Sequence, residues 1–328
     1  MPLRERSLIA ELRRIAESSP GRRSRRGEQA IGQGIGDDCA VLRVPPGHES
    51  LITTDFSLEG IHFRREWHPP ESVGHRCLTR GLSDVAAMGG APIAAFLSLA
   101  IPRDLRQSWV DQFTHGLLGL AERYSVVLAG GDTAQSPGGV LADIVVVGSV
   151  PKGKTVLRSG ARPGDRIVIS GELGGSAAAI RRMMTGEKVR LRQYPRHFYP
   201  EARIALGQRL RQTRLATSMI DTSDGLSTDL SHLCAESGVG AEIDAALIPR
   251  ASVGWPKQMV DLDLALHGGE DYELLFTVAA GKTIPPRLAG VRLTQIGSIT
   301  RSRGIWLRDR GGARRKLEPK GWEHFSES

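Results

Sequence analysis

The chain has 328 residues, 40% of them hydrophobic and 24% charged, with 39 glycines, 18 prolines and a formal net charge of +8. This length favours two domains, and the composition is typical of a soluble globular protein rather than a disordered or fibrous one. No apolar run approaches the roughly 20 residues of a membrane span. The amino terminus does not match a signal peptide, so we expect a cytoplasmic protein without a membrane partner.

The first half of the chain is predicted to mix strands and helices. The arginine-rich run at 21–28 could hold nucleic acid, but no aromatic residues interleave with its arginines, so we interpret it as a solvated loop. The turn PPGH is predicted to join two strands, 39–44 and 50–56, into a hairpin. The remaining predicted elements are helices over 3–18, 72–88 and 105–123 and strands over 91–102, 125–133 and 140–150, the strand over 125–133 running into a loop.

The second half repeats this mixture after a plausible linker, PKGK at 151–154. We therefore expect one domain over 1–150 and a second over 151–328. Three helices are predicted, after GELGG, within 201–212 and after DTSDG, and the strands lie within 161–170, 241–249, 273–280, 293–300 and 305–309. The fold class is accordingly α+β, with mixed α/β layers.

Carboxylates in this chain gather beside glycine, serine and threonine, at what we expect to be strand-end loops. Each one alone would be read as an Asx-turn or a helix N-cap. Together they favour Mg²⁺, which prefers a few carboxylates plus water and phosphate oxygens, and no contiguous calcium loop is present. The acidic residues are Asp37, Asp38, Asp55, Asp84, Asp132, Asp221, Asp224, Glu270 and Asp271.

Several magnesium ions would imply a polyphosphate ligand, but the sequence contains neither a GxxxxGK[ST] loop nor the protein-kinase motif set. The segment GELGGSAAAI could present backbone N–H groups to a phosphate, although a plain strand-to-helix turn is the commoner meaning. Arg158 is a candidate phosphate or nucleotide contact, and a surface position explains it equally well. The three cysteines lack metal-site spacing, and we expect them to be small buried residues.

Seven motifs in order carry a resemblance: GIGDDCAVL, TTDFSLEGIHF, LSDVAAMGGAP, AGGDT, LRSGARPGD, DTSDGLSTDL and GGEDYELLF. In this order and spacing, the chain resembles the thiamine-monophosphate kinase family, within the superfamily of aminoimidazole ribonucleotide synthetase. The resemblance implies the two-domain fold of that superfamily. The N-terminal mixed sheet would pair with that of a second copy as a homodimer barrel, and the C-terminal α/β domain would complete the nucleotide and substrate site.

The resemblance also implies a reaction: transfer of the γ-phosphoryl group of ATP to thiamine monophosphate, giving thiamine diphosphate and ADP. Several Mg²⁺ ions would offset the repulsion between the two anions. The acceptor phosphate is already ionised, so no catalytic general base is assigned and the transfer is expected to be direct and in line. No nucleic-acid partner is expected.

Each implied residue role comes from a position that matches a family motif. The metal ligands would be Asp38, Thr53, Thr54, Asp55, Asp84, Asp132, Asp221 and Asp224. Contacts to ATP would come from Tyr124, Gly131, Asp132, Arg158 and Ser223, and contacts to the thiamine substrate from His62, Glu270 and Trp322.

Other interpretations predict different features. Selenophosphate synthetase would carry a reactive cysteine or selenocysteine in a glycine-rich N-terminal loop, followed by a lysine, and the hydrogenase-maturation relative would end in a cysteine, whereas this chain ends HFSES. The purine-pathway enzymes differ around the first metal loop. Outside the superfamily, a nucleic-acid-binding protein would leave the acidic motifs unexplained, and a structural metal-binding module would need neither His62 nor Arg158.

Overall fold

The computed structural model describes residues 30–35, 38–309 and 311–322. These residues form two compact units. The first comprises the described chain up to Val85 together with Gly90–Gly153, and the second comprises Ala86–Gly89 and the chain from Lys154 onward. The predicted helix over 3–18 and the arginine-rich run at 21–28 lie outside the described residues.

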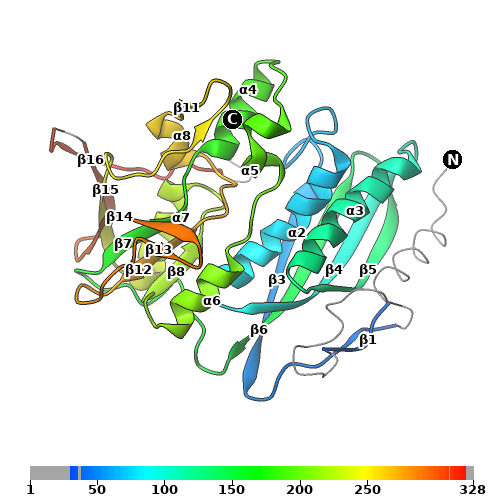
Figure 1. Ribbon diagram of the computed structural model, residues 1–328, viewed down its shortest axis with the longest axis horizontal. Helices are drawn as coiled ribbons and strands as arrows, with labels where there is room; N and C mark the ends of the chain where they lie inside the picture. Colours follow the sequence, from blue (N-terminus) through cyan, green and yellow to red (C-terminus); the bar gives the residue numbers. More distant parts are fainter. Residues whose placement is uncertain (1–29, 36–37, 310, 323–328) are drawn as a thin grey trace. The chain divides into compact units, whose positions relative to one another are not determined.

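The first unit is built on a four-stranded sheet in the order β3-β6-β4-β5. The strands are β3 (His48–Leu58), β4 (Ala91–Pro102), β5 (Val127–Ser136) and β6 (Leu141–Pro151), and β4 and β5 run parallel while the other pairs are antiparallel. The long helices α2 (Pro70–Ala87) and α3 (Gln107–Arg123) lie side by side against this sheet (Figure 1).

Two glycines explain why these helices approach so closely. A Cβ at Gly74 of α2 would lie 1.9 Å from the Phe113 carbonyl oxygen, and a Cβ at Gly116 of α3 would lie 1.9 Å from the Glu71 carbonyl oxygen. The helix backbones therefore touch where side chains would otherwise hold them apart.

The predicted hairpin of strands 39–44 and 50–56 is wrong. The short strand β2 (Val41–Leu42) pairs with β1 (Ile31–Gln33), and β3 pairs along its whole length with β6. The reason is that β6 offers β3 an eleven-residue antiparallel partner, which is a larger ladder than the short segment before Pro45 could provide.

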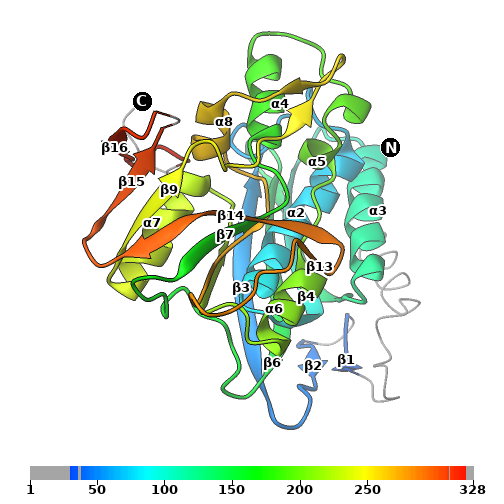
Figure 2. The same cartoon turned by 60° about the vertical axis from the view of Figure 1, so that its left-hand side comes forward.

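The second unit is built on an eight-stranded sheet in the order β16-β15-β9-β14-β7-β12-β8, with β13 added beside β14. Figure 2 shows β16, β15, β9, β14 and β7 of this sheet. The β15 and β9 pair is parallel and the other pairs are antiparallel. Its strands are β7 (Arg166–Ser170), β8 (Ser218–Asp221), β9 (Gly240–Asp244), β12 (Leu274–Val278), β13 (Arg287–Leu288), β14 (Val291–Thr300), β15 (Gly304–Arg308) and β16 (Arg314–Lys316).

Helices and one small hairpin accompany this sheet. Helix α7 (Leu226–Ser237) packs against β8, β9 and β12, and the hairpin pairs β10 (Ser252–Val253) with β11 (Gln258–Met259). The other helices are α4 (Gly175–Met184), η2 (Leu191–Gln193), α5 (Pro195–Phe198), α6 (Ile204–Gln212) and α8 (Leu262–His267). None of the helices in the described part of the chain is both long enough and apolar enough to cross a membrane.

Candidate functional site

The acidic cluster of the first unit forms where β3 faces α2. Because side chains alternate along a strand, Thr53 and Asp55 share the face of β3 that looks toward α2, and Thr54 lies on the other face. The Thr53 hydroxyl donates to Asp84 Oδ2 on α2, and the Thr54 hydroxyl donates to Asp143 Oδ1 on β6 at 2.7 Å. Residues far apart in sequence thus bring the carboxyl groups of Asp55 and Asp84 together between β3 and α2, while Asp143 lies with Thr54 on the other face of the sheet.

The surroundings of Asp55 disfavour the charged form of its side chain. The pKa of Asp55 is raised from 3.8 to about 7, chiefly by burial and next by the nearby carboxylate of Asp84, and the Arg80 guanidinium opposes the rise. A group of carboxylates that repel one another in this way is stabilised by an added cation, which lowers the pKa of each ligand. The donor set of carboxylate and hydroxyl oxygens matches what Mg²⁺ prefers.

Three of the predicted loop carboxylates lie instead inside regular elements. Asp55 belongs to β3 and Asp132 to β5, because these strands continue through the segments that were expected to be loops, and Asp84 lies inside the helix α2. In β5 the continuation depends on Gly131, since a Cβ there would lie 1.9 Å from the carbonyl oxygen of Leu97 on the parallel neighbour β4. Asp132 itself is exposed, and its carboxylate accepts the N–H of Thr133.

The remaining candidates of the first unit surround this sheet. Asp38 is exposed, beyond the end of β1. His62 lies in the turn after β3, where the N–H of Leu58 donates to its Nδ1 at 3.0 Å, so its proton sits on Nε2 and can be donated. Tyr124 ends α3 half-buried, with the Arg123 guanidinium 6.0 Å from the centre of its ring.

In the second unit, a loop between β8 and α7 carries three more candidates. Asp221 is the last residue of β8 and is buried, while Ser223 and Asp224 follow in the loop, partly exposed. The loop is held by Asp229 on α7, whose Oδ2 accepts the N–H groups of Asp224 at 3.2 Å and Gly225 at 3.0 Å.

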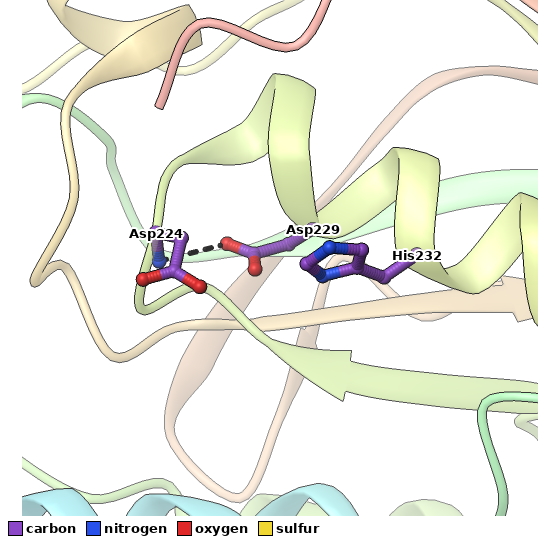
Figure 3. Close-up of side chains that lie close together, drawn as sticks. All are labelled: Asp224, Asp229 and His232. Atoms are coloured by element: carbon purple, nitrogen blue, oxygen red, sulfur yellow. Dashed lines mark hydrogen bonds between the residues drawn. The ribbon is translucent and has the colours of Figure 1, made fainter. Parts of the chain in front are cut away.

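Asp229 is a functional candidate that the sequence analysis missed, although it lies within the motif DTSDGLSTDL. Asp224, Asp229 and His232 can each bring a ligand atom within 4.8 Å of the others, as Figure 3 shows. Burial raises the pKa of Asp229 well above its ordinary value, and the charges of Asp221 and Asp224 add to that rise. The sequence carries a signal for Asp229: it occupies a helix position that the spacing of the apolar residues predicts to be buried, where a carboxylate is unusual.

Two substrate candidates contact the same loop. The N–H of Glu270 donates to the Ser223 carbonyl oxygen at 2.8 Å, and the N–H of Trp322 donates to the Asp224 carbonyl oxygen at 3.1 Å. Gly321 makes the second contact possible, because a Cβ there would lie 1.9 Å from the same Asp224 oxygen. The structure therefore brings Ser223, Asp224, Glu270 and Trp322 together.

Arg158 is placed differently from those four residues. Its carbonyl oxygen accepts the Ser237 hydroxyl at 3.0 Å, and Ser237 is the last residue of α7, whereas Asp224 precedes the first. A helix of twelve residues spans about 18 Å, so the backbone of Arg158 lies at the far end of α7 from the loop.

Comparison with known proteins identifies the class of this fold. Residues 36–150 match the family model described as AIR synthase related protein, N-terminal domain, and residues 162–304 match the corresponding C-terminal domain. The two-domain fold of mixed α/β class expected from the sequence is therefore confirmed.

Individual relatives narrow the class further. Thiamine-monophosphate kinase of Escherichia coli K12 is 38% identical over 308 residues, covering 89% of this chain and 92% of the relative. The solved structure of AaThiL complexed with AMPPCP and TMP is 32% identical, covers 98% of this chain and 97% of that chain, and superposes with a TM-score of 0.76. The chain belongs to the thiamine-monophosphate kinase family.

More distant structures share the fold alone. The hydrogenase maturation protein HypE in complex with ATP is 16% identical, with a TM-score of 0.74 over 97% of this chain. The 16% identity to HypE is well below the 38% and 32% identity to the two thiamine-monophosphate kinase relatives, so the comparisons favour the kinase branch over this alternative.

Proposed function

We propose that this protein transfers the γ-phosphoryl group of ATP to thiamine monophosphate, producing thiamine diphosphate and ADP. The observation that carries the proposal is the close match, over nearly the whole chain, to thiamine-monophosphate kinases, one of which binds an ATP analogue together with TMP. The acidic clusters of both units support it, since phosphoryl transfer between two anions needs cations and positioning rather than covalent help.

The residues of the two clusters would hold several Mg²⁺ ions. Asp38, Thr53, Thr54, Asp55, Asp84 and Asp132 would do so in the first unit, and Asp221 and Asp224 in the second. The raised pKa of Asp55 supports this assignment, because burial and the neighbouring Asp84 carboxylate disfavour the charged form of Asp55, which a bound cation would favour. When bound, the metal neutralises charge on the phosphate oxygens.

The protein's own side chains would orient the two substrates. We assign ATP contacts to Tyr124, Gly131, Asp132, Arg158 and Ser223, and thiamine contacts to His62, Glu270 and Trp322. Trp322 suits such a role because half of its surface is exposed. The acceptor phosphate carries its own negative charge, so no side chain needs to remove a proton.

We also propose a homodimer that works in the cytoplasm, where ATP is available. The face of β3 that points away from α2 exposes 72% of Ile52 and 55% of Phe56. Large apolar side chains on a sheet face are a common feature of protein interfaces. A second copy of the same sheet, packed face to face as a barrel, would cover them.

The decisive experiment is an assay with γ-labelled ATP and thiamine monophosphate, with and without Mg²⁺. We expect labelled thiamine diphosphate only with Mg²⁺, and a loss of on the order of 100-fold or more in kcat for Asp55→Asn. Asp111→Asn, which changes an exposed carboxylate on α3, is the matched control and should retain full activity.

Other outcomes would redirect the assignment. ADP formed without labelled thiamine diphosphate would indicate another ATP-dependent reaction of the superfamily. Retention of configuration at the γ-phosphorus would contradict direct in-line transfer, because a single displacement inverts it.

A further inference from the structure

Glu273 is the most heavily bonded buried carboxylate described in the second unit. Its side chain is completely buried. Its oxygens accept from Ser170 Oγ at 2.5 Å, Arg196 Nη1 at 2.6 Å, Arg203 Nε at 2.8 Å and Arg203 Nη2 at 2.5 Å. Two guanidinium groups thus bind one carboxylate. Arg203 binds it in a bidentate way, through both carboxylate oxygens, which is the strongest geometry for such a pair.

These partners come from separate parts of the unit. Ser170 ends β7, Arg196 belongs to the short helix α5, and Arg203 immediately precedes α6. The carboxylate also needs Gly171, because a Cβ there would lie 2.0 Å from Glu273 Oε1. Through these bonds, the cluster links the connection at 195–203 to Glu273, the residue that immediately precedes β12.

Glu273 ends the loop that carries Glu270. In that loop Glu270 has a φ of 64° and Tyr272 a φ of 50°, both in the left-handed region that non-glycine residues rarely adopt. Such residues persist where surrounding contacts hold them. Here the N–H of Glu270 donates to the Ser223 carbonyl oxygen and the N–H of Tyr272 to the Thr222 carbonyl oxygen, at 2.8 Å and 2.9 Å.

The backbone of Glu273 continues the same set of contacts. Its carbonyl oxygen accepts the N–H of Thr222 at 2.8 Å, and its own N–H donates to the Thr222 hydroxyl at 3.1 Å. Glu273 is thus fixed by its side chain to the two arginines and by its backbone to the loop that contains Ser223 and Asp224. A shift of this one residue would move both site loops.

We propose that Arg196 and Arg203 act through Glu273 as positioning residues, which hold Glu270 in its left-handed conformation and so set the affinity for the thiamine-containing substrate. The proposal rests on the proposed function for the identity of that substrate. A cluster that only stabilised the fold would change the unfolding temperature and leave substrate affinity unaltered, so the two roles can be separated.

Arg196→Gln is the variant that tests this role. Half of the Arg196 side chain is exposed, so its removal leaves no large cavity, and Glu273 keeps Arg203 as a partner. We expect the KM for thiamine monophosphate to rise on the order of 10-fold, with the KM for ATP unchanged. Arg196→Lys should recover part of the loss, because Arg196 contacts Glu273 through one nitrogen that an ammonium group can replace. Arg192→Gln, at an exposed arginine of the neighbouring element η2, is the matched control.

Hydrogen exchange of the peptide covering 268–273 gives a second readout that does not depend on the substrate. We expect faster exchange in this peptide for Arg196→Gln than for the wild type or Arg192→Gln. Unchanged exchange would overturn the proposal, and so would faster exchange with an unchanged KM for thiamine monophosphate. If the wild type fails to phosphorylate thiamine monophosphate, the proposed function fails, and the exchange experiment still decides whether the arginines position the loop.

Discussion

At the scale of single residues, Asp271 shows how a partly buried carboxyl group can connect the loop that carries Glu270 to a helix. Its Oδ2 accepts the N–H of Gly174 at 2.7 Å, at the start of α4. The pKa of Asp271 is raised from 3.8 to about 7, chiefly by burial and also by the charge of Glu273, while backbone hydrogen bonds and Arg196 oppose the rise. The folded protein therefore keeps this group protonated at pH values where the unfolded chain has lost the proton.

The sign of the resulting pH dependence follows from that difference. Below pH 4 Asp271 is protonated in both states, and between pH 4 and 7 only the unfolded state releases the proton, so folding stability falls as pH rises through this window. We expect the wild type to lose on the order of 3 kcal/mol more than Asp271→Asn between pH 4 and 8. Urea unfolding across that range measures it, and parallel curves for the two proteins would contradict the prediction.

At the scale of elements, β5 depends on one glycine for its contact with β4. Because a Cβ at Gly131 would lie 1.9 Å from the Leu97 carbonyl oxygen, Gly131→Ala must push the parallel strands apart. We expect a loss of about 2 kcal/mol in the free energy of unfolding. The proposed ATP contacts would move with the strand, and we expect the KM for ATP to rise on the order of 10-fold.

Gly138→Ala is the control for this prediction. Gly138 lies in the turn between β5 and β6, and a Cβ there would meet no atom within 4 Å. Thermal unfolding and ATP titrations of both variants give the comparison. Equal behaviour of the two alanine variants would mean that the close approach of β5 to β4 is not needed for stability or nucleotide binding.

Strand β3 shows which features the sequence could predict. Its alternating pattern predicted a strand and its acidic motif predicted a site residue. The motifs of the chain together correctly predicted the fold class and the family. The pairing of β3 was not readable, because the partner β6 lies far along the chain, with Thr54 and Asp143 89 residues apart, while the local turn signal at PPGH favoured a hairpin. Local sequence patterns predict whether a segment is a strand or a helix, but they do not predict which other strand it pairs with.

The candidate site shows the same limit. Residues inside recognisable motifs, such as Asp224 and Glu270, could be chosen from the sequence, and the structure places them in contact through Ser223. Asp229 was missed although its buried helix position could have signalled it, whereas Glu273 could not be chosen, because its role depends on arginines from other segments. The placement of Asp55, Asp84 and Asp132 in loops was wrong. The Gly, Ser and Thr residues beside them were taken to mark the ends of strands, but these positions lie inside β3, α2 and β5.

At the scale of the whole molecule, the proposed homodimer rests on the exposed face of β3. A lysine at position 56 would place a charge among apolar side chains that a partner sheet would bury, and an unpaired buried charge is strongly unfavourable. We expect Phe56→Lys to weaken self-association at least 100-fold, since the loss of a few kcal/mol corresponds to that factor. Sedimentation equilibrium at micromolar concentrations measures this directly.

The control for that variant is Met184→Lys, which adds the same charge at a side chain that is 71% exposed on α4 of the second unit. We expect Met184→Lys to associate like the wild type. If the nucleotide site depends on the barrel, the Phe56→Lys monomer should also lose phosphoryl transfer while keeping its fold, because β3 carries both Phe56 and the acidic Asp55. A wild type that sediments as a 35.5 kDa monomer at tens of micromolar would contradict the dimer and leave the exposed face of β3 to another partner.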